Sequence, residues 1–178
     1  MAIFPSTAIP SGASAFTIDQ SLKCENGRGT CLKKTPAAAS NRKTWTLSVW
    51  LKRSKLSSEQ RIFGAYDSGA AEVAAIDWST GGAGDVLYWH LGGASNIRFY
   101  TTPRYRDTSG WYHFCFEIDT TQSTSTDRIK TWVNGVQETS FSSTTYPAED
   151  ANLIIDGGSG YTTYIGQRGG SSLYFNGL

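Results

Sequence analysis

Residues 44–53 read TWTLSVWLKR, and this stretch decides the fold class. Its apolar residues Trp45, Leu47, Val49 and Leu51 occupy every second position, which is the period of a β-strand with one buried face. Mostly polar residues fill the positions between them, with Trp50 as the exception. The stretch therefore predicts an antiparallel strand with one face in a core and the other toward water.

The same alternation recurs along the chain, and a sustained helical period does not. Further strands are expected at 61–66, 73–78, 86–91, 97–102, 112–118, 128–133, 136–141, 151–156, 161–167 and 173–175, separated by turn-forming residues. Asn134-Gly135 predicts a tight hairpin, because a type I′ turn needs positive φ at both central positions. The chain of 178 residues is thus predicted to be one all-β domain, an antiparallel two-sheet sandwich, with residues 1–15 as an extended N-terminal arm.

The charge balance argues against nucleic acid or anionic membranes as partners. Sixteen Lys and Arg residues stand against 15 Asp and Glu, a formal charge of +1 without a basic block. The start, MAIFPSTAIPSGASAF, lacks the charged and apolar regions of a secretion signal, and no stretch has the roughly 18 apolar residues of a membrane span. We therefore expect neither nucleic-acid binding nor membrane insertion.

The cysteines leave two alternatives open. Cys24 and Cys31 flank the turn-forming ENGRG and could face each other across a hairpin. Two reduced neighbours are favoured over a disulfide, because a chain made without an export signal meets a reducing cytoplasm. Cys115 lies in an apolar run and is expected to be a small, buried apolar residue.

Three segments together resemble laminin-G-like modules of the concanavalin A-like lectin/glucanase superfamily: RKTWTLSVWLKR (42–53), YRDTSGWYHFCFEIDTT (105–121) with RIKTWVNGVQ (128–137), and YTTYIGQRGGSSLYFNGL (161–178). The resemblance implies a jelly roll. More narrowly, AIPSGASAFTIDQSLKC (8–24), KTPAAASNRKTWT (34–46) and RDTSGWYH (106–113) resemble domains of tail-fibre and other virion-surface proteins of marine tailed bacteriophages. Relatives normally continue past Phe-x-Gly with one more strand, so the resemblance implies a final strand that is missing or supplied by another chain.

The Glu117-Ile118-Asp119 triplet resembles the catalytic strand of the glucanase branch, which carries Glu-x-Asp-x-Glu or a bulged variant. Retaining hydrolysis needs a nucleophile and an acid/base on one face, about 5 Å apart. Thr121 and Gln122 stand at the two acid/base positions, and neither can protonate a leaving oxygen. No catalytic residue is therefore predicted.

The aromatic residues point instead to binding. Six Trp, nine Tyr and eight Phe exceed what the core obviously needs, and flat aromatic faces stack on sugar rings. The candidate ligand-binding residues are Trp50, Tyr88, His90, Tyr100, Trp132 and Glu117. The alternative is that these aromatics fill a sheet interior or a subunit interface.

Calcium is the one cofactor that the resemblance implies, because lectin relatives often bind it at a loop rim. Asp67, Asp85, Asp119 and Asp156 lie in or near loops that could converge, although no contiguous ligand series exists. Solvated carboxylates are the default for these positions.

The function predicted from these features is a non-enzymatic module on a bacteriophage virion surface that adheres to host-surface glycan. The expected partners are host polysaccharide, other virion proteins and further copies of the chain. The first alternative is a capsid or tail decoration protein that uses the same aromatics as a protein interface. A glycan hydrolase is the least favoured reading.

Overall fold

The computed structural model describes residues 22–25, 28–67, 72–79, 84–91, 97–153, 158, 160–169 and 173–178. Apart from one 3-10 turn, η1 (Ser125–Asp127), all regular elements in this part of the chain are β-strands. None of the described helical residues forms a segment long and apolar enough to cross a membrane. The predicted arm at residues 1–15 and Asp156 lie outside the described residues.

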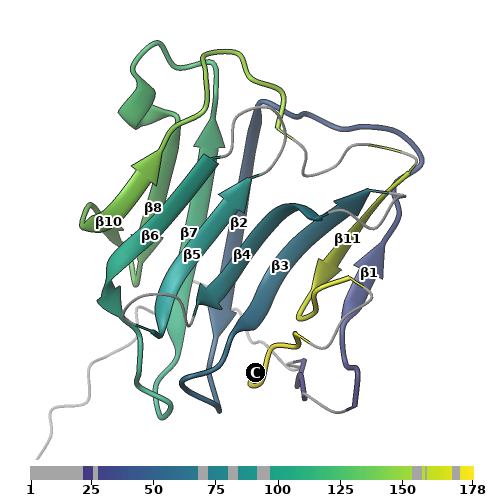
Figure 1. Ribbon diagram of the computed structural model, residues 1–178, viewed down its shortest axis with the longest axis vertical. Coiled ribbons are helices and arrows are strands. Elements are labelled where there is room, and N and C mark those ends of the chain that lie inside the picture. Colours follow the sequence, from purple (N-terminus) through teal and green to yellow (C-terminus); the bar gives the residue numbers. More distant parts are fainter. Residues whose placement is uncertain are drawn as a thin grey trace, which may run out of the picture.

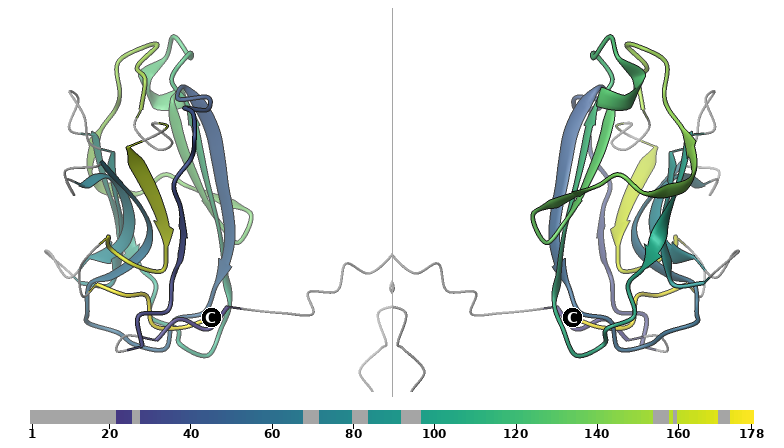
Figure 2. Two further views of the ribbon diagram at one scale, coloured as in Figure 1. Left: turned by 90° about the vertical axis from the view of Figure 1, so that its right-hand side faces the viewer. Right: turned by 90° about the vertical axis from the view of Figure 1, so that its left-hand side faces the viewer.

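Two antiparallel sheets stack face to face, as Figure 2 shows edge-on. The larger sheet has the strand order β1 (Leu32–Lys34), β11 (Tyr161–Ile165), β3 (Gln60–Asp67), β4 (Glu72–Ser79), β5 (Val86–Leu91), β6 (Ile97–Arg104) and β10 (Phe141–Thr145), as seen in Figure 1. The smaller sheet consists of β2 (Thr44–Leu51), β7 (Tyr112–Asp119), β8 (Ile129–Val133) and β9 (Val136–Glu138). The predicted all-β sandwich is confirmed.

The core follows the alternation seen in the sequence. β2 and β7 pair so that Leu47 lies opposite Phe116 and Val49 opposite Phe114, and both phenylalanines are fully buried. From the facing sheet, Trp89 packs edge-on against Phe116 with 4.7 Å between ring centroids. Such edge-to-face aromatic pairs contribute beyond the apolar area that they bury. The inner faces of both sheets thus form one aromatic-rich core.

The hairpin prediction is also confirmed. Asn134 and Gly135 adopt φ values of 51° and 80° between β8 and β9, as the tight turn requires. Positive φ at a non-glycine residue is uncommon, and Asn is among the residues that tolerate it best. The turn places Val136 directly opposite Val133 and fixes the register of the hairpin.

Three predicted strands were wrong in extent. The run at 136–141 divides into β9 and β10, because Ser140 turns away to donate its N–H to Glu138 and its carbonyl accepts from Thr102 in the other sheet. Residues 151–153 are not a strand, since Leu153 is bonded to the loop residue Arg42 through both its N–H and its carbonyl. At 173–175 only an isolated bridge forms, between Tyr174 and Gln167.

The C-terminal residues add a short ladder beside β2. Leu178 and Lys52 exchange two backbone hydrogen bonds of 2.8 and 2.9 Å, and Gly177 forms an antiparallel bridge to Cys24 on its other side. Two short strand segments therefore lie side by side next to the residues that follow β2.

All three cysteines are free thiols. The predicted burial of Cys115 is wrong, because it lies opposite Trp132 on the outer face of its sheet and is only partly buried. Cys24 is buried against Gly166, where an added Cβ would lie 2.8 Å from its sulfur atom. Burial raises the pKa of the Cys24 thiol, and the nearby Cys31 raises it further. The structure thus corresponds to the reduced alternative.

Candidate functional site

The structure divides the predicted ligand-binding residues between two opposite surfaces. Tyr88, His90 and Tyr100 lie on the outer face of the seven-stranded sheet, because their strand neighbours Leu87, Trp89 and Phe99 are buried in the core. Trp50, Glu117 and Trp132 alternate with core residues of β2, β7 and β8, and lie on the outer face of the four-stranded sheet. The six residues therefore cannot form one site.

On the seven-stranded sheet the aromatic rings mostly stack on one another. The Tyr88 and Tyr100 rings are 4.3 Å apart at their centroids, and the His90 ring lies 6.3 Å from Tyr88 and nearly parallel to it. Burial raises the pKa of Tyr88, and the neighbouring Tyr100 hydroxyl adds to the effect. Since Tyr88 stacks closely on Tyr100, one face of each ring is covered by the other.

On the four-stranded sheet the main aromatic is open to solvent. Trp50 is 55% exposed, and the His113 ring lies opposite it on β7 with 5.0 Å between ring centroids. His113 is held in place because its Nε2 is 2.9 Å from the Ser48 hydroxyl and its backbone N–H donates to Asn134 Oδ1 at 2.8 Å. The structure thus fixes a tryptophan–histidine pair with a large free indole surface.

Neighbouring residues on β7, β8 and β9 add a second tryptophan and charged groups to this surface. Trp132 lies opposite Cys115 on one side and Gln137 on the other, and Glu117 lies opposite Lys130. β2 and β8 are separated only by β7, so the two tryptophans lie about 10 Å apart across the strands. We call the surface formed by Trp50, His113, Trp132, Gln137, Glu117 and Lys130 the Trp50–Trp132 face.

Sequence reasoning missed three members of this face. His113, Lys130 and Gln137 were not among the predicted ligand-binding residues. The alternation of β7 and β8 does place His113 and Lys130 outward, and the Asn134-Gly135 turn brings Gln137 beside Trp132. Combining the strand period with the hairpin register could have found all three.

Asp119 closes the turn that follows β7. Its carboxylate accepts hydrogen bonds from the Thr121 N–H and hydroxyl at 3.0 and 2.6 Å, and from the Gln122 side-chain amide at 2.6 Å. The bonds from the Thr121 and Gln122 side chains lower the pKa of Asp119. The two residues at the acid/base positions therefore act together to hold Asp119 in a turn.

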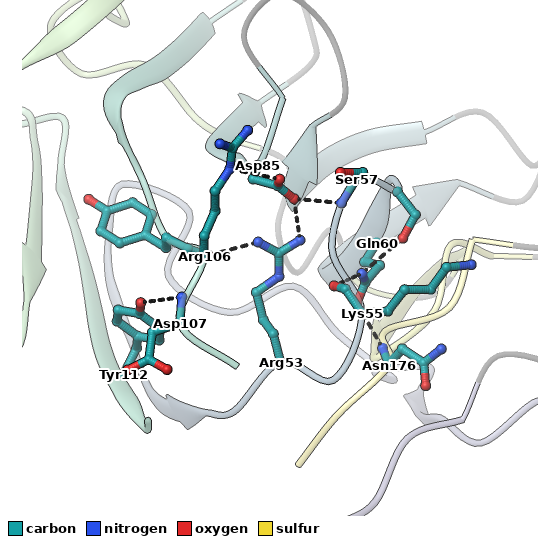
Figure 3. A network of polar contacts seen from close by, with 11 residues as sticks. Arg53, Lys55, Ser57, Gln60, Asp85, Arg106, Asp107, Tyr112 and Asn176 are labelled. Atoms are coloured by element: carbon teal, nitrogen blue, oxygen red, sulfur yellow. Dashed lines mark hydrogen bonds and ion pairs between the residues drawn. The ribbon is translucent and has the colours of Figure 1, made fainter. Parts of the chain in front are cut away.

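Asp85 belongs to a buried ion network, drawn in Figure 3. Its carboxylate lies 2.9 Å from Arg53 Nη2 and 3.1 Å from Arg106 Nε, and it accepts the Ser57 N–H at 2.8 Å. Arg53 is fully buried, donates to the Tyr105 carbonyl at 2.8 Å and has its Cζ 4.4 Å from the centroid of the Trp78 ring. This network ties the end of β2 to the strands of the larger sheet.

The pKa of Asp85 reflects these contacts. Burial by itself would raise the pKa of the carboxyl, but the Ser57 hydrogen bond and the two guanidinium groups outweigh burial and hold the pKa below its ordinary value. The carboxylate is thus ionised and occupied by cationic partners, which leaves it poorly suited to a calcium ion.

The described residues contain no group of three His, Cys, Asp or Glu side chains that could hold a metal ion. Asp85 and Asp119 have the partners given above, Asp67 lies at the end of β3, and Asp156 is outside the described residues. Calcium binding stays a prediction without a site in the described part of the chain.

Comparison with solved structures finds matches of low sequence identity. A heptameric SAP-like pentraxin from Limulus polyphemus aligns with 83% of this chain and 65% of its own, at 16% identity and a TM-score of 0.56. The full extracellular region of zebrafish Gpr126/Adgrg6 aligns over 83% and 20% of the two chains, at 14% identity and a TM-score of 0.47. A tetrameric galectin from the ball sponge Cinachyrella sp. aligns over 84% and 96%, at 15% identity and a TM-score of 0.44.

The chain thus spans less than two thirds of the length of the pentraxin chain, and at these identities only the fold is shared. No curated protein sequence matches. A family model described as the concanavalin A-like lectin/glucanases superfamily matches residues 27–178, nearly the whole chain. Together with the two-sheet sandwich, this match shows that the chain belongs to the concanavalin A-like lectin/glucanases superfamily.

Proposed function

We propose that this chain is a non-enzymatic carbohydrate-binding module and that it binds glycan on the Trp50–Trp132 face. The observation that carries the proposal is Trp50, a large aromatic side chain that is 55% exposed and fixed beside His113 on a sheet surface. An exposed aromatic with an apolar face is suited to stack on a sugar ring, and nearby polar groups orient the hydroxyls.

The arrangement of the face supports an extended ligand. Trp50 and Trp132 lie about 10 Å apart across the strands, so a chain of several sugar units can contact both. Gln137, Glu117 and Lys130 provide an amide, a carboxylate and an ammonium group along the same surface. An open sheet face buries less of a ligand than a deep pocket, so we expect weak single-site affinity that multivalent attachment strengthens.

The same face supports binding without hydrolysis. Glu117 lies opposite Lys130, and the residues at the acid/base positions, Thr121 and Gln122, hydrogen-bond to Asp119. A glycosidase needs a proton donor for the leaving oxygen, and neither side chain can serve as one.

We further propose that the module sits on a bacteriophage virion surface, in a tail fibre or a related appendage, and that its ligand is a host-surface polysaccharide. The support is the resemblance of segments 8–24, 34–46 and 106–113 to phage tail-fibre and virion-surface domains. Attachment to other virion proteins and homo-oligomerisation would supply the multivalency that weak single sites need.

The test is a glycan array of bacterial surface polysaccharides, followed by titration of the best ligand. Trp50→Ala and Trp132→Ala should each weaken binding about 5- to 10-fold, from roughly 1 kcal/mol of lost stacking, while Tyr100→Ala on the opposite sheet should not. Loss of binding in Tyr100→Ala alone would move the site to the seven-stranded sheet. Failure to bind any polysaccharide at any surface density would reject the adhesion function.

One observation favours a second candidate, a structural role in virion assembly. Trp111 is 43% exposed just before β7, and together with Trp50 it gives this side of the molecule an apolar character suited to a protein interface. Analytical sedimentation measures the oligomeric state, and quenching of tryptophan fluorescence by acrylamide measures the exposure of Trp50. An oligomer in which Trp50 is shielded from acrylamide would support the assembly role over glycan binding.

A further inference from the structure

Two cysteines lie at one edge of the seven-stranded sheet and have no role in the proposed function. Cys24 is 4% exposed, and its backbone N–H and carbonyl form hydrogen bonds of 2.9 and 3.1 Å with Gly177. Cys31 comes directly before β1, the edge strand that pairs with β11. The two cysteines thus belong to two short segments that the fold holds through different partners.

A compact turn between the two cysteines brings them toward each other. The Arg28 N–H donates to the Glu25 carbonyl at 3.2 Å, and the Arg28 Nε lies 2.9 Å from the Glu25 carboxylate. A chain reversal of this kind places the residues on its two sides next to each other. Cys24 directly precedes the turn and Cys31 follows it closely, so both cysteines lie near its base.

Gly166, which follows β11, leaves space for the sulfur atoms. β1 and β11 pair with Leu32 opposite Ile165, and the same antiparallel register places Cys31 opposite Gly166. Residues that lie directly opposite each other place their side chains on the same side of the sheet. A Cβ added at Gly166 would lie 2.8 Å from the Cys24 sulfur, so that sulfur fills the place of the missing side chain. The Cys24 sulfur and the Cys31 side chain therefore lie beside each other.

Two further observations agree with this placement. The carbonyl oxygen of Thr30, the residue before Cys31, is 3.6 Å from the same Cβ position at Gly166. Burial raises the pKa of the Cys24 thiol, and the charge of a Cys31 thiolate raises it further, which requires the two groups to be close. Cys24 is thus the protected thiol of the pair, and Cys31, which is only partly buried, is the accessible one.

We propose that Cys24 and Cys31 form a redox site, which closes to a disulfide when the protein meets a low-molecular-weight disulfide such as glutathione disulfide. The Cys31 thiolate attacks one sulfur of the reagent and breaks its S–S bond, and the half that leaves takes up the proton that Cys31 lost. The Cys24 thiolate then attacks the Cys31 sulfur and releases the other half in the same way. Two protein thiols are oxidised, and one reagent disulfide is reduced to two thiols.

The disulfide joins the segment that pairs with Gly177 to the edge strand β1, whose residues are all exposed. It closes a loop of about eight residues, and such a link stabilises a fold mainly by limiting the conformations of the unfolded chain. Oxidation should therefore stabilise this edge of the sheet, and excess thiol should restore the reduced form that the structure has. The proposal does not depend on glycan binding at the Trp50–Trp132 face.

Peptide mapping tests the disulfide directly. Trypsin cleaves after Arg28, between the two cysteines, and the resulting peptides 24–28 and 29–33 stay joined only through a disulfide. The full chain is equilibrated with mixtures of oxidised and reduced glutathione, blocked with iodoacetamide and digested without reductant. We expect the joined peptides to increase as the mixture becomes more oxidising and to be absent from Cys31→Ser. Cys115→Ser, on the outer face of the four-stranded sheet, is the matched control and should behave as wild type.

Thermal melts measure the effect on stability. The Tm of oxidised wild type should exceed that of the reduced protein by about 5 °C, and the same glutathione mixtures should not shift the Tm of Cys31→Ser. Wild type that ends with glutathione attached to both cysteines and no joined peptide would overturn the proposal, because the two sulfur atoms would then be out of reach of each other. Joined peptides that contain Cys115 in equal yield, or that occur only between two chains, would overturn it as well.

Discussion

Replacing Asp85 by asparagine should destabilise the protein more than any other single change in its ion network. Arg53 is 0% exposed, and Asp85 is the acidic group bonded to it, so the substitution leaves a buried guanidinium without its counter-ion. Asparagine keeps the acceptor oxygen for the Ser57 N–H and tolerates the positive φ of 54° at this position. The change therefore removes the charge and the second acceptor oxygen, to which Arg106 Nε donates.

The size of the expected loss in unfolding free energy depends on how deeply each charged side chain is buried. Breaking a buried ion pair from one side costs about 3–5 kcal/mol, whereas a partner that is half exposed contributes about 1 kcal/mol or less. Arg106 is half exposed, so Arg106→Met should cost at most the smaller amount. Arg53→Met should fall between them, because Asp85 then keeps both Arg106 and the Ser57 N–H. For a domain of 178 residues, the loss in Asp85→Asn corresponds to a fall in Tm on the order of 10 °C.

Urea unfolding and thermal melts, both monitored by circular dichroism on the wild type and the three variants, measure the order of these stability losses. The midpoint should fall most for Asp85→Asn, less for Arg53→Met and least for Arg106→Met. A loss in Asp85→Asn no larger than that in Arg106→Met would refute the reasoning, because it would mean that water or another group compensates the buried guanidinium.

Three further predictions concern pH, backbone strain and thiol reactivity. Because the pKa of Asp85 is lower in the folded state, its contribution to stability is full above the unfolded pKa of about 4 and is lost as pH falls through the folded pKa. The difference in unfolding free energy between wild type and Asp85→Asn should shrink from pH 6 to pH 2, and a constant difference would contradict this. Gly135→Ala should cost about 1 kcal/mol in urea unfolding from the φ of 80° alone, since no atom lies within 4 Å of the added Cβ, and an unchanged midpoint would count against the strain. Iodoacetamide should alkylate Cys31 before Cys24, whose thiol is buried with a raised pKa; peptide mass spectrometry that finds equal rates would show that this segment opens readily.

Local sequence patterns predicted the individual strands of this fold better than they predicted which strands pair. The alternation around Trp45 and Leu47 sufficed for β2, and Asn134-Gly135 sufficed for the hairpin, because both depend on neighbouring residues. β1 was missed since its residues, LKK, are all exposed and show no alternation. The division of 136–141 was missed because it depends on the chain crossing to Thr102 in the other sheet.

The candidate site was predicted only in part, because it also depends on which strands pair. Alternation shows that Trp50 and Tyr88 both point away from a core, but it does not show that they point in opposite directions. That depends on which sheet each strand joins, and strand pairing is non-local. Asp85 illustrates the limit further: as a carboxylate after GGAG it reads as a solvated loop residue, and only the fold brings Arg53, Arg106 and Ser57 to it.

β2 carries two features on which the predictions depend, and they lie on different sides of the strand. Trp50 points outward to the Trp50–Trp132 face, and Arg53 just beyond the strand points into the buried network. Because Arg53 fixes the end of β2 at which Trp50 lies, Asp85→Asn should weaken glycan binding at Trp50 more than Arg106→Met does. Equal glycan affinity in the two variants would instead indicate that the position of Trp50 does not depend on the ion network.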